Sequence, residues 1–413
     1  MSSFRKRATA SQPALPPGTR LNPHSGTLLM STGVPALDDV LGGGLPVGGI
    51  LLIEEDRRTG YSSTLLSFFA SQAIASGHQL CVVDADHDVD PRTQFPGWAG
   101  AVRDEPTPSQ GARPSDSAAA APADPMKIAW RYQNLPQVGA GSDEPGRSGG
   151  GGGGAGLGVP FCEHFDLSLR IPAAVVDAAR IDILDADALA QMAGDERCGG
   201  DTYRCVLDKI AALIDDGYSS LKPVAPDTVR GILRIELRSL GSGLWHGSDS
   251  QSILRFLHGL RGLLRYSYAT CVASFPGHLY EDGGGRLPVV RRVEHLCDAV
   301  VELESFEGAR VSPAEIVARQ ARARAGAAAA AQDYHGFVHI HKLPRLNSLT
   351  ASTGRLSLLH TGGGSANNLA FRLRRKKFSI ETYHLPIEGS VGERRVPADG
   401  HGSTSSRTDP LAF

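Results

Sequence analysis

The chain has 413 residues, enough for one large α/β domain or two ordinary ones. Its 42 Lys and Arg residues nearly balance 44 Asp and Glu residues, so any contact with nucleic acid would need a local basic patch rather than net charge. The N-terminus lacks the apolar core of a signal peptide, and no apolar run approaches the roughly 18 residues of a membrane span. We therefore expect a soluble intracellular protein.

The first part of the chain predicts an arm, two strands and a helix. Residues 1–25 are polar and rich in proline, which is typical of a flexible N-terminal arm. An apolar run over 51–53 predicts a buried strand. Residues 62–76 have one apolar face and predict a helix, with Gly77 suited to its C-terminal cap. The run QLCVVDAD predicts a second buried strand that ends in acidic residues.

Three stretches have the composition of insertions into a folded core. Residues 99–125 are rich in Ala, Pro, Ser and Asp, and residues 139–158 contain six consecutive glycines, so we expect both to be disordered loops. Residues 314–332 are rich in Ala and Arg and predict either a helix or a third insertion. We also expect a flexible C-terminal tail over 389–413, which leaves a single domain over 26–388.

Regular structure is predicted again in the second half. Residues 201–216 and 249–265 have the apolar spacing of helices. Strands that alternate with helices and then follow one another indicate an α/β fold, with a mostly parallel twisted sheet flanked by helices and extended by antiparallel strands. The strands are predicted over 229–237, 269–275, 299–306, 336–343 and 371–385.

The stretch LLIEEDRRTGYSST, residues 51–64, has the strand, loop and helix setting of a phosphate-binding loop, which reads G-x-x-x-x-G-K-[ST]. Here Glu55 replaces the first glycine and Tyr61 replaces the lysine, while Gly60 and Ser62 keep their positions. A carboxylate about 4 Å from a phosphate charge repels it by about 4 kcal/mol at an effective dielectric constant of about 20. We therefore expect a turn that is kept for its shape and binds ATP very weakly.

The segment that precedes the loop reads STGVPALDDVLGGGLPVGGILLI over residues 31–53. Ser31 or Thr32 is suited to a local cap, and three glycines permit a turn that needs unsubstituted backbone. The order S-T-G-x-x-x-L-D-x-x-L-G-G-G, then a glycine, a strand and the loop, resembles the RecA, Rad51 and KaiC superfamily of ring-forming ATPases. This resemblance places Glu236 at the Walker B acid; the alternative is a charged strand end that faces solvent or a neighbouring subunit.

Five of the eight residues in FRLRRKKF, residues 371–378, are basic. Basic residues interleaved with aromatic ones are typical of phosphate contacts combined with base stacking. The alternative is an edge strand whose charges prevent strand addition. On one extended strand, three of the side chains would share a face and two would share the other. The candidate RNA-binding residues are Arg372, Arg374, Arg375, Lys376 and Lys377.

Several segments together resemble the PAXNEB family of Elongator subunits. They are LGGGLPVGGILLIEEDRRTGYSSTLL, WRY at 130–132, FCEHFDLS at 161–168, LRIELRSLGSGLW at 233–245 and the terminal LRRKKFSIETYHLP. The resemblance implies a RecA-like fold without a working phosphate loop. It also implies a heterohexameric ring with Elongator proteins 5 and 6, which binds tRNA, hydrolyses ATP and serves the catalytic Elongator subcomplex in modifying wobble uridines.

On this reading the chain is an accessory subunit of the cytoplasm and nucleus, with no catalytic residue, no metal site and no tightly bound cofactor of its own. ATP would then belong to the assembled ring. The alternative is an active RecA- or KaiC-type ATPase that binds nucleotide at subunit interfaces, with an arginine supplied by a neighbour. The missing lysine favours the first reading.

Overall fold

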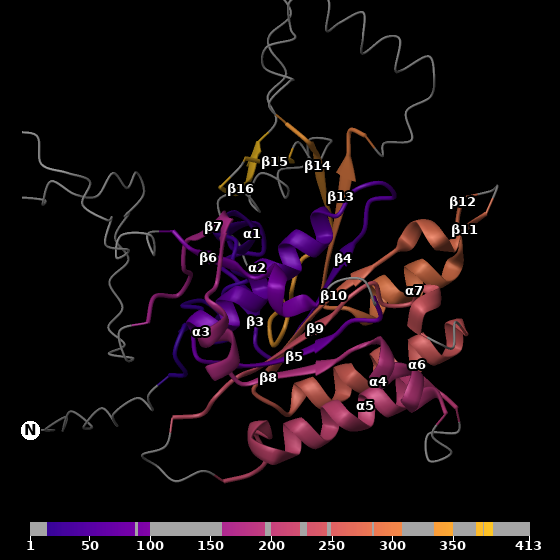
Figure 1. Cartoon of the computed structure of the whole chain (residues 1–413), viewed down its shortest axis with the longest axis horizontal. Helices are drawn as coiled ribbons and strands as arrows, with labels where there is room; N and C mark the ends of the chain where they lie inside the picture. Colours follow the sequence, from indigo (N-terminus) through magenta and orange to yellow (C-terminus); the bar gives the residue numbers. More distant parts are fainter. Residues whose placement is uncertain are drawn as a thin grey trace, which may run out of the picture.

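The computed structural model describes residues 15–86, 90–99, 159–194, 200–223, 229–245, 249–282, 285–307, 334–349, 369–374 and 376–382. They form a nine-stranded sheet in the order β16-β15-β14-β13-β4-β10-β9-β5-β8, with helices on both faces (Figure 1). The six strands from β13 to β8 are parallel, and β14, β15 and β16 extend the sheet in antiparallel fashion. The predicted RecA-like α/β architecture is confirmed.

The strands of the large sheet overlap the segments predicted as strands, except for β8, which was not predicted. The parallel strands are β4 (Ile50–Glu54), β5 (Gln79–Val83), β8 (Ile181–Leu184), β9 (Leu233–Leu237), β10 (Ala269–Phe275) and β13 (Ala299–Ser305). The antiparallel strands are β14 (Gly336–Lys342), β15 (Leu369–Leu373) and β16 (Phe378–Thr382). The smaller sheets contain β1 (Thr19–Leu21), β2 (Leu28–Met30), β3 (Leu45–Pro46), β6 (Pro96–Trp98), β7 (Phe165–Arg170), β11 (Glu281–Asp282) and β12 (Gly285–Arg286).

Helices cover both faces of the sheet, so its central strands are buried on both sides. Ile50 and Leu52 of β4 pack in a core with the helices of one face, whereas Leu51 and Ile53 pack in a second core with those of the other. The face with Ile50 and Leu52 carries α4 (Ala186–Ala193), α5 (Thr202–Leu213), α6 (Ser250–Arg265) and α7 (Pro288–Leu296). The other face carries α1 (Pro35–Val40), α2 (Tyr61–Ala75) and α3 (Ala173–Ala178).

No described helix is long and apolar enough to cross a membrane. The predicted helices over 62–76, 201–216 and 249–265 correspond to α2, α5 and α6, and Gly77 has the positive φ of +67° expected after a helix.

The structure corrects the expected N-terminal arm. Strand β1 lies within residues 1–25 and pairs with β2, and the carbonyl oxygen of Pro17 lies 2.9 Å from His78 Nε2. The ordered fold therefore begins before Gly26. Residues 1–14 lie outside the described part of the chain, as do residues 100–125 and 139–158, the 314–332 stretch and the 389–413 tail.

The motif that precedes β4 builds a buried polar cluster rather than a helix cap. Helix α1 begins after Val34 without a side-chain cap, so the prediction that Ser31 or Thr32 caps it locally is wrong. Both hydroxyls instead donate hydrogen bonds to the Asp38 carboxylate. The buried Arg234 guanidinium donates to the Ser31 carbonyl oxygen at 2.8 Å. Burial raises the pKa of Asp38 to about 6, against the lowering effect of these hydrogen bonds and of Arg234.

Candidate functional site

The loop between β4 and α2 lies where a phosphate-binding loop would lie, but its hydrogen-bonding groups are used internally. The backbone N–H of Glu55 donates to the Phe275 carbonyl oxygen at 2.9 Å, and its carboxylate accepts from Ser239 Oγ at 2.8 Å. Ser239 lies two residues after the end of β9, and its φ is +43°. The residue at the first glycine position therefore ties the loop to the ends of β9 and β10.

A second carboxylate, that of Asp56, accepts hydrogen bonds from other residues of the same loop. Asp56 Oδ2 accepts hydrogen bonds from the Arg58 backbone N–H at 3.2 Å and from Thr59 Oγ1 at 2.9 Å. A phosphate-binding loop offers such N–H groups to the ligand anion. Here a carboxylate of the chain itself already accepts from one of them.

The residue at the lysine position is turned into aromatic packing. The Tyr61 ring lies edge-on to Phe371 of β15, with 4.8 Å between ring centroids, and 6.0 Å from the His335 ring. It therefore fixes the start of α2 against the antiparallel strands. Ser62, at the position of the magnesium-binding hydroxyl, is buried, and Gly60 is the N-cap of α2.

Glu236 is buried on the α2 side of β9, so it faces neither solvent nor a neighbouring subunit as the alternative reading required. Its Oε1 accepts from Arg238 Nε at 2.6 Å, and the Nη1 atom of Arg238 lies 3.3 Å from Asp84 Oδ2. Nη1 also donates to Gln94 Oε1 at 3.0 Å. Burial raises the pKa of Glu236, and Arg238 opposes that shift. A guanidinium thus neutralises the acid that would otherwise help to hold magnesium.

Sequence reasoning missed this counter-ion. Arg238 follows Glu236 by two residues, so the two side chains share one face of an extended segment, and that spacing was the available signal. Asp84 is 154 residues away in the chain and joins only because β5 and β9 are neighbours. Sequence reasoning counted Glu54 among the loop carboxylates, but it is the last residue of β4 and lies on the opposite face of the sheet. Burial raises the pKa of Glu54 to about 7, against the opposing effect of Arg286.

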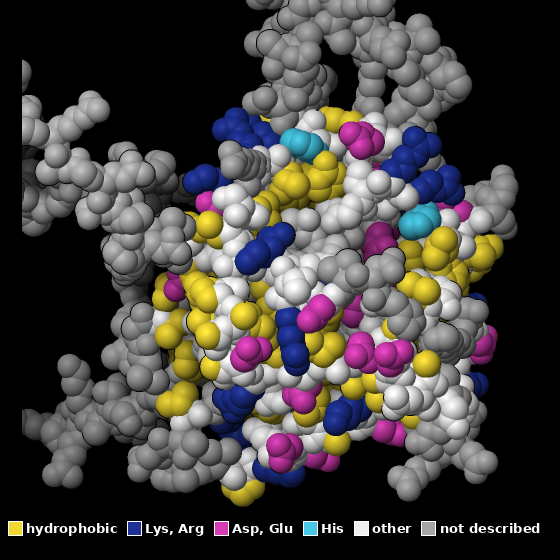
Figure 2. Space-filling model, viewed as in Figure 1, with side chains coloured by type: hydrophobic (Ala, Val, Ile, Leu, Met, Phe, Trp, Pro, Cys, Tyr) yellow, Lys and Arg dark blue, Asp and Glu magenta, His cyan; other side chains and the backbone are white. Residues whose placement is uncertain are grey.

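The basic segment is a hairpin and not the single strand predicted over 371–385. Strand β15 ends at Leu373, a turn closes through hydrogen bonds between the Arg374 and Lys377 backbones, and β16 begins at Phe378. The predicted alternation of side chains between two faces is therefore wrong from Arg374 onward. Lys and Arg side chains gather at this edge of the molecule in Figure 2.

The basic residues of this hairpin have different environments. Arg372 is half-buried, pairs with Glu381 at 2.6 Å and lies over the Tyr334 ring, so it holds the two strands together. Arg374, Lys376 and Lys377 are exposed, and Lys376 lies 3.3 Å from Asp166 of β7. Arg375 lies outside the described residues.

An open groove runs beside the hairpin, between α2, β7 and the end of β15. Its volume is about 320 Å³. The groove is lined by Thr64, Leu167, Arg170, Leu373 and Arg374.

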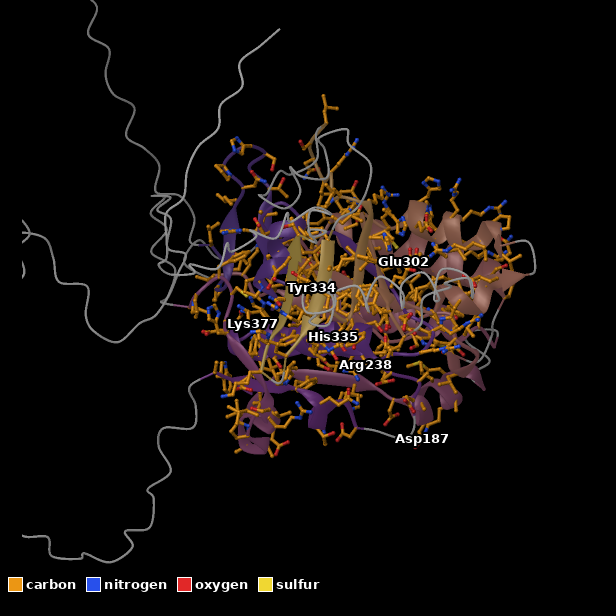
Figure 3. All side chains as sticks on the ribbon, turned by 90° about the horizontal axis from the view of Figure 1, so that it is seen from above. Asp187, Arg238, Glu302, Tyr334, His335 and Lys377 are labelled. Carbon is orange, nitrogen blue, oxygen red and sulfur yellow. The ribbon has the colours of Figure 1, made fainter. Side chains whose placement is uncertain are left out.

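Viewed from above, Lys377 and Glu302 lie on opposite sides of Tyr334, so the basic hairpin is separate from the acidic groups of β13 (Figure 3).

Comparison with known proteins identifies the family of this chain. The family model described as PAXNEB protein matches residues 12–413. The chain is 36% identical to Elongator complex protein 4 of Xenopus laevis over 93% of this chain and 86% of that protein. It is 33% identical to the Homo sapiens protein of the same name, over 89% and 79%, and 23% identical to that of Saccharomyces cerevisiae, over 95% and 82%. Because the family model spans nearly the whole chain, the chain belongs to the PAXNEB protein family.

Proposed function

We propose that this chain is a non-catalytic subunit of the Elongator complex. In this proposal it forms a heterohexameric ring with Elongator proteins 5 and 6, in the cytoplasm and nucleus. The ring binds tRNA and serves the catalytic subcomplex in the modification of wobble uridines. Similarity to proteins named Elongator complex protein 4 supports membership of the complex.

One observation carries the non-catalytic assignment: the groups that would contact a nucleotide have partners within the chain. Asp56 accepts from a loop N–H, Tyr61 packs on Phe371, and Arg238 neutralises Glu236. A nucleotide would have to displace a carboxylate and would meet no lysine. These internal contacts fix the shape of the strand, loop and helix, which suits a role in ring assembly.

Nucleotide binding by the purified chain tests this assignment. We expect titration with a fluorescent ATP analogue and Mg²⁺ to show no saturation at micromolar concentrations. Micromolar affinity that is lost in Ser62→Ala would reveal a functioning magnesium site and would refute the assignment. Saturation that appears only in the ring, and is lost when a neighbour's arginine is replaced, would favour a nucleotide site at subunit interfaces instead.

We further propose that the hairpin contributes phosphate contacts to tRNA binding through Arg374, Lys376 and Lys377. Their exposure and their position beside the groove support this assignment. Arg375 belongs to the same sequence segment and stays a candidate. Arg372 is assigned to the fold, because it bridges β15 and β16 through Glu381.

The salt dependence of tRNA binding by the assembled ring tests the hairpin. Each phosphate contact contributes about 0.7 to the slope of log affinity against log salt for single-stranded RNA. We expect the double variant Arg374→Ala, Lys377→Ala to weaken binding. It should also flatten the slope by about 1 to 1.5 for each copy of this subunit whose two side chains contact phosphates. The matched control, Ser379→Ala in β16, should leave the slope unchanged. An unchanged slope in the double variant, with the ring intact, would place the RNA site elsewhere.

A further inference from the structure

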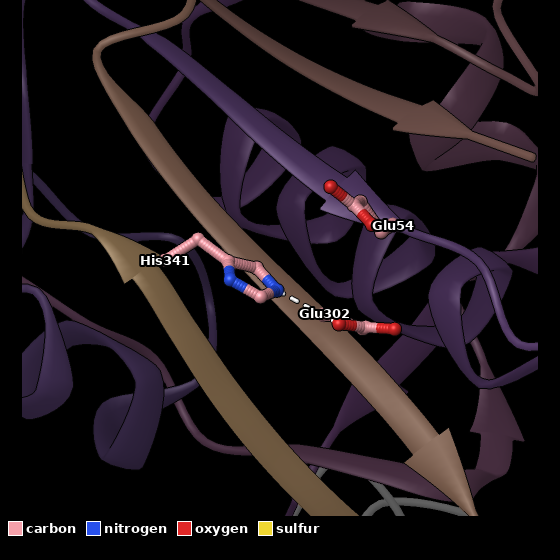
Figure 4. A group of neighbouring side chains, drawn as sticks. All are labelled: Glu54, Glu302 and His341. Atoms are coloured by element: carbon pink, nitrogen blue, oxygen red, sulfur yellow. Dashed lines mark hydrogen bonds and ion pairs between the residues drawn. The ribbon is translucent and has the colours of Figure 1, made fainter. Parts of the chain in front are cut away.

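A second cluster of polar side chains lies on the face of the sheet that is covered by α7. Glu54 ends β4, Glu302 lies beside it in β13, and His341 reaches across from β14 (Figure 4). His341 Nε2 lies 2.7 Å from Glu302 Oε2. One ligand atom of each of the three residues lies within 4.8 Å of the other two. The three residues come from neighbouring strands, so the backbone hydrogen bonds of the sheet fix their spacing.

Glu54 is the unusual member of this cluster. It is 1% exposed, and neither of its carboxylate oxygens has a hydrogen-bond partner among the described residues. Arg286 Nη1 lies 2.9 Å from Oε2 as an ion pair, which leaves Oε1 without any such contact. A buried carboxylate oxygen without a partner costs free energy, because the water it has lost is not replaced. A bound cation would replace that water.

Arg286 does not fill the position that a cation would take. Its Nη2 contacts Oε1 of Glu302, whereas His341 contacts Oε2 of the same carboxylate. The guanidinium and a metal ion can therefore use different oxygens of one carboxylate, as outer partners of metal ligands commonly do. Glu294 also lies 3.6 Å from Arg286. Glu54, Glu294 and Glu302 thus place three carboxylates beside one guanidinium, an excess of acidic groups that a divalent ion would offset.

We propose that Glu54, Glu302 and His341 form a binding site for one divalent transition-metal ion, of the class of Zn²⁺. Two carboxylate oxygens and one imidazole nitrogen are ligands that zinc accepts, at about 2.0–2.2 Å each. Tetrahedral ligands at that distance lie about 3.3–3.6 Å apart. A separation of 4.8 Å would therefore have to close by about 1.2–1.5 Å, whereas the 2.7 Å between His341 Nε2 and Glu302 Oε2 would have to open by about 0.6–0.9 Å. The ion would take the place of the hydrogen between His341 and Glu302. The site is independent of the RNA-binding proposal.

Solvent can reach the remaining coordination position. The side chains of His341 and Glu302 are 34% and 24% exposed, whereas Glu54 closes the inner side. A site with three protein ligands and one open position holds water or an incoming ligand there. The ion would join β4, the strand that leads into the loop, to β13 and β14.

Metal titration of the full-length chain tests this site. The protein is stripped with EDTA, dialysed and titrated with Zn²⁺ by calorimetry at neutral pH, and Co²⁺ is used as a spectroscopic substitute. We expect one ion per chain, visible absorption from the Co²⁺ form, and a higher melting temperature when Zn²⁺ is present. Glu54→Gln and His341→Asn should each weaken binding by more than about 100-fold, since loss of an outer partner alone costs 10- to 100-fold.

The neighbouring His339 and Glu304 supply a matched control. They form the same kind of pair at 2.7 Å on the same two strands, but among the described residues no third ligand-type side chain completes a group with them. His339→Asn should therefore keep the wild-type affinity and stoichiometry. Absence of saturable binding, or equal binding by wild type, Glu54→Gln and His341→Asn, would overturn the proposal. Melting curves in EDTA confirm that each variant is folded, and Glu302→Gln replaces any variant that is not.

Discussion

His78 should lower the free energy of unfolding of this protein at acidic pH. The ring is buried; its Nδ1 lies 3.1 Å from Arg234 Nε, and its Nε2 lies 2.9 Å from the Pro17 carbonyl oxygen. Arg234 can only donate, so Nδ1 accepts and Nε2 carries the proton. A second proton on Nδ1 would face a guanidinium in a buried site. Burial first, and Arg234 second, lower the pKa of His78 to about 3.

The sign and the size of the effect follow from this shift. The unfolded chain has a histidine pKa of about 6.5, so below that pH the unfolded state takes up a proton that the folded state refuses. The free energy of unfolding therefore falls as the pH drops below about 6.5, and it keeps falling until the folded state protonates near pH 3. At pH 5 the loss attributable to this one residue is about 2 kcal/mol relative to pH 7, at about 1.4 kcal/mol per pH unit.

Urea denaturation at pH 7 and pH 5 measures this contribution. In His78→Gln the amide can still accept from Arg234 and donate to Pro17, but it does not titrate. We expect the variant to lose about 2 kcal/mol less than wild type between the two pH values. His258→Gln, at an exposed position of α6, should keep the wild-type dependence. Equal losses in wild type and His78→Gln would refute the reasoning.

Two further predictions concern stability. The insertion predicted over 99–125 begins after Ala99, because the Ala99 N–H donates to the His164 carbonyl oxygen at 2.8 Å. Removing residues 101–125 and 139–158 should leave the melting temperature and partner binding nearly unchanged, since a doubling of loop length costs only about 0.6 kcal/mol. Loss of soluble expression would contradict this. Gly44 has a φ of +122°, and a Cβ there would lie 2.7 Å from a backbone oxygen. Gly44→Ala should therefore lower the free energy of unfolding, measured by urea denaturation, by more than about 2 kcal/mol. Gly262→Ala in α6, with open space around it, should raise that free energy by about 1 kcal/mol. Similar effects at the two glycines would contradict the second.

The core strands and long helices could be predicted from sequence because each has a period that few other structures produce. The largely apolar strands β4 and β10 are buried on both faces, and α6 repeats its apolar residues at helical spacing. The hairpin at 374–377 could not be predicted, because its turn is built from charged residues without Gly, Pro or Asn. Strands of two or three residues, such as β1 and β3, depend on tertiary pairing that leaves no local signal.

The candidate site shows the same division between local and long-range information. The loss of the phosphate-loop glycine and lysine was visible at Glu55 and Tyr61. The residues that now contact Tyr61 could not be seen in the sequence. Phe371 lies more than 300 residues away from Tyr61 in the chain, and only the antiparallel extension of the sheet brings the two together. A sequence motif reports which ligand contacts are missing. It does not report which residues have taken up the vacated space.

The way in which those contacts were replaced bears on what the loop is for. A phosphate-binding loop that merely lost its lysine would leave N–H groups and an acid without partners, and unpaired polar groups in a buried site destabilise the fold. Here Asp56 pairs with a loop N–H, Arg238 pairs with Glu236, and Glu55 pairs with Ser239. These contacts join the carboxyl ends of β4 and β9 through groups of the chain itself. A surface that must stay rigid for assembly needs such internal partners, whereas a site that cycles with ATP needs them absent.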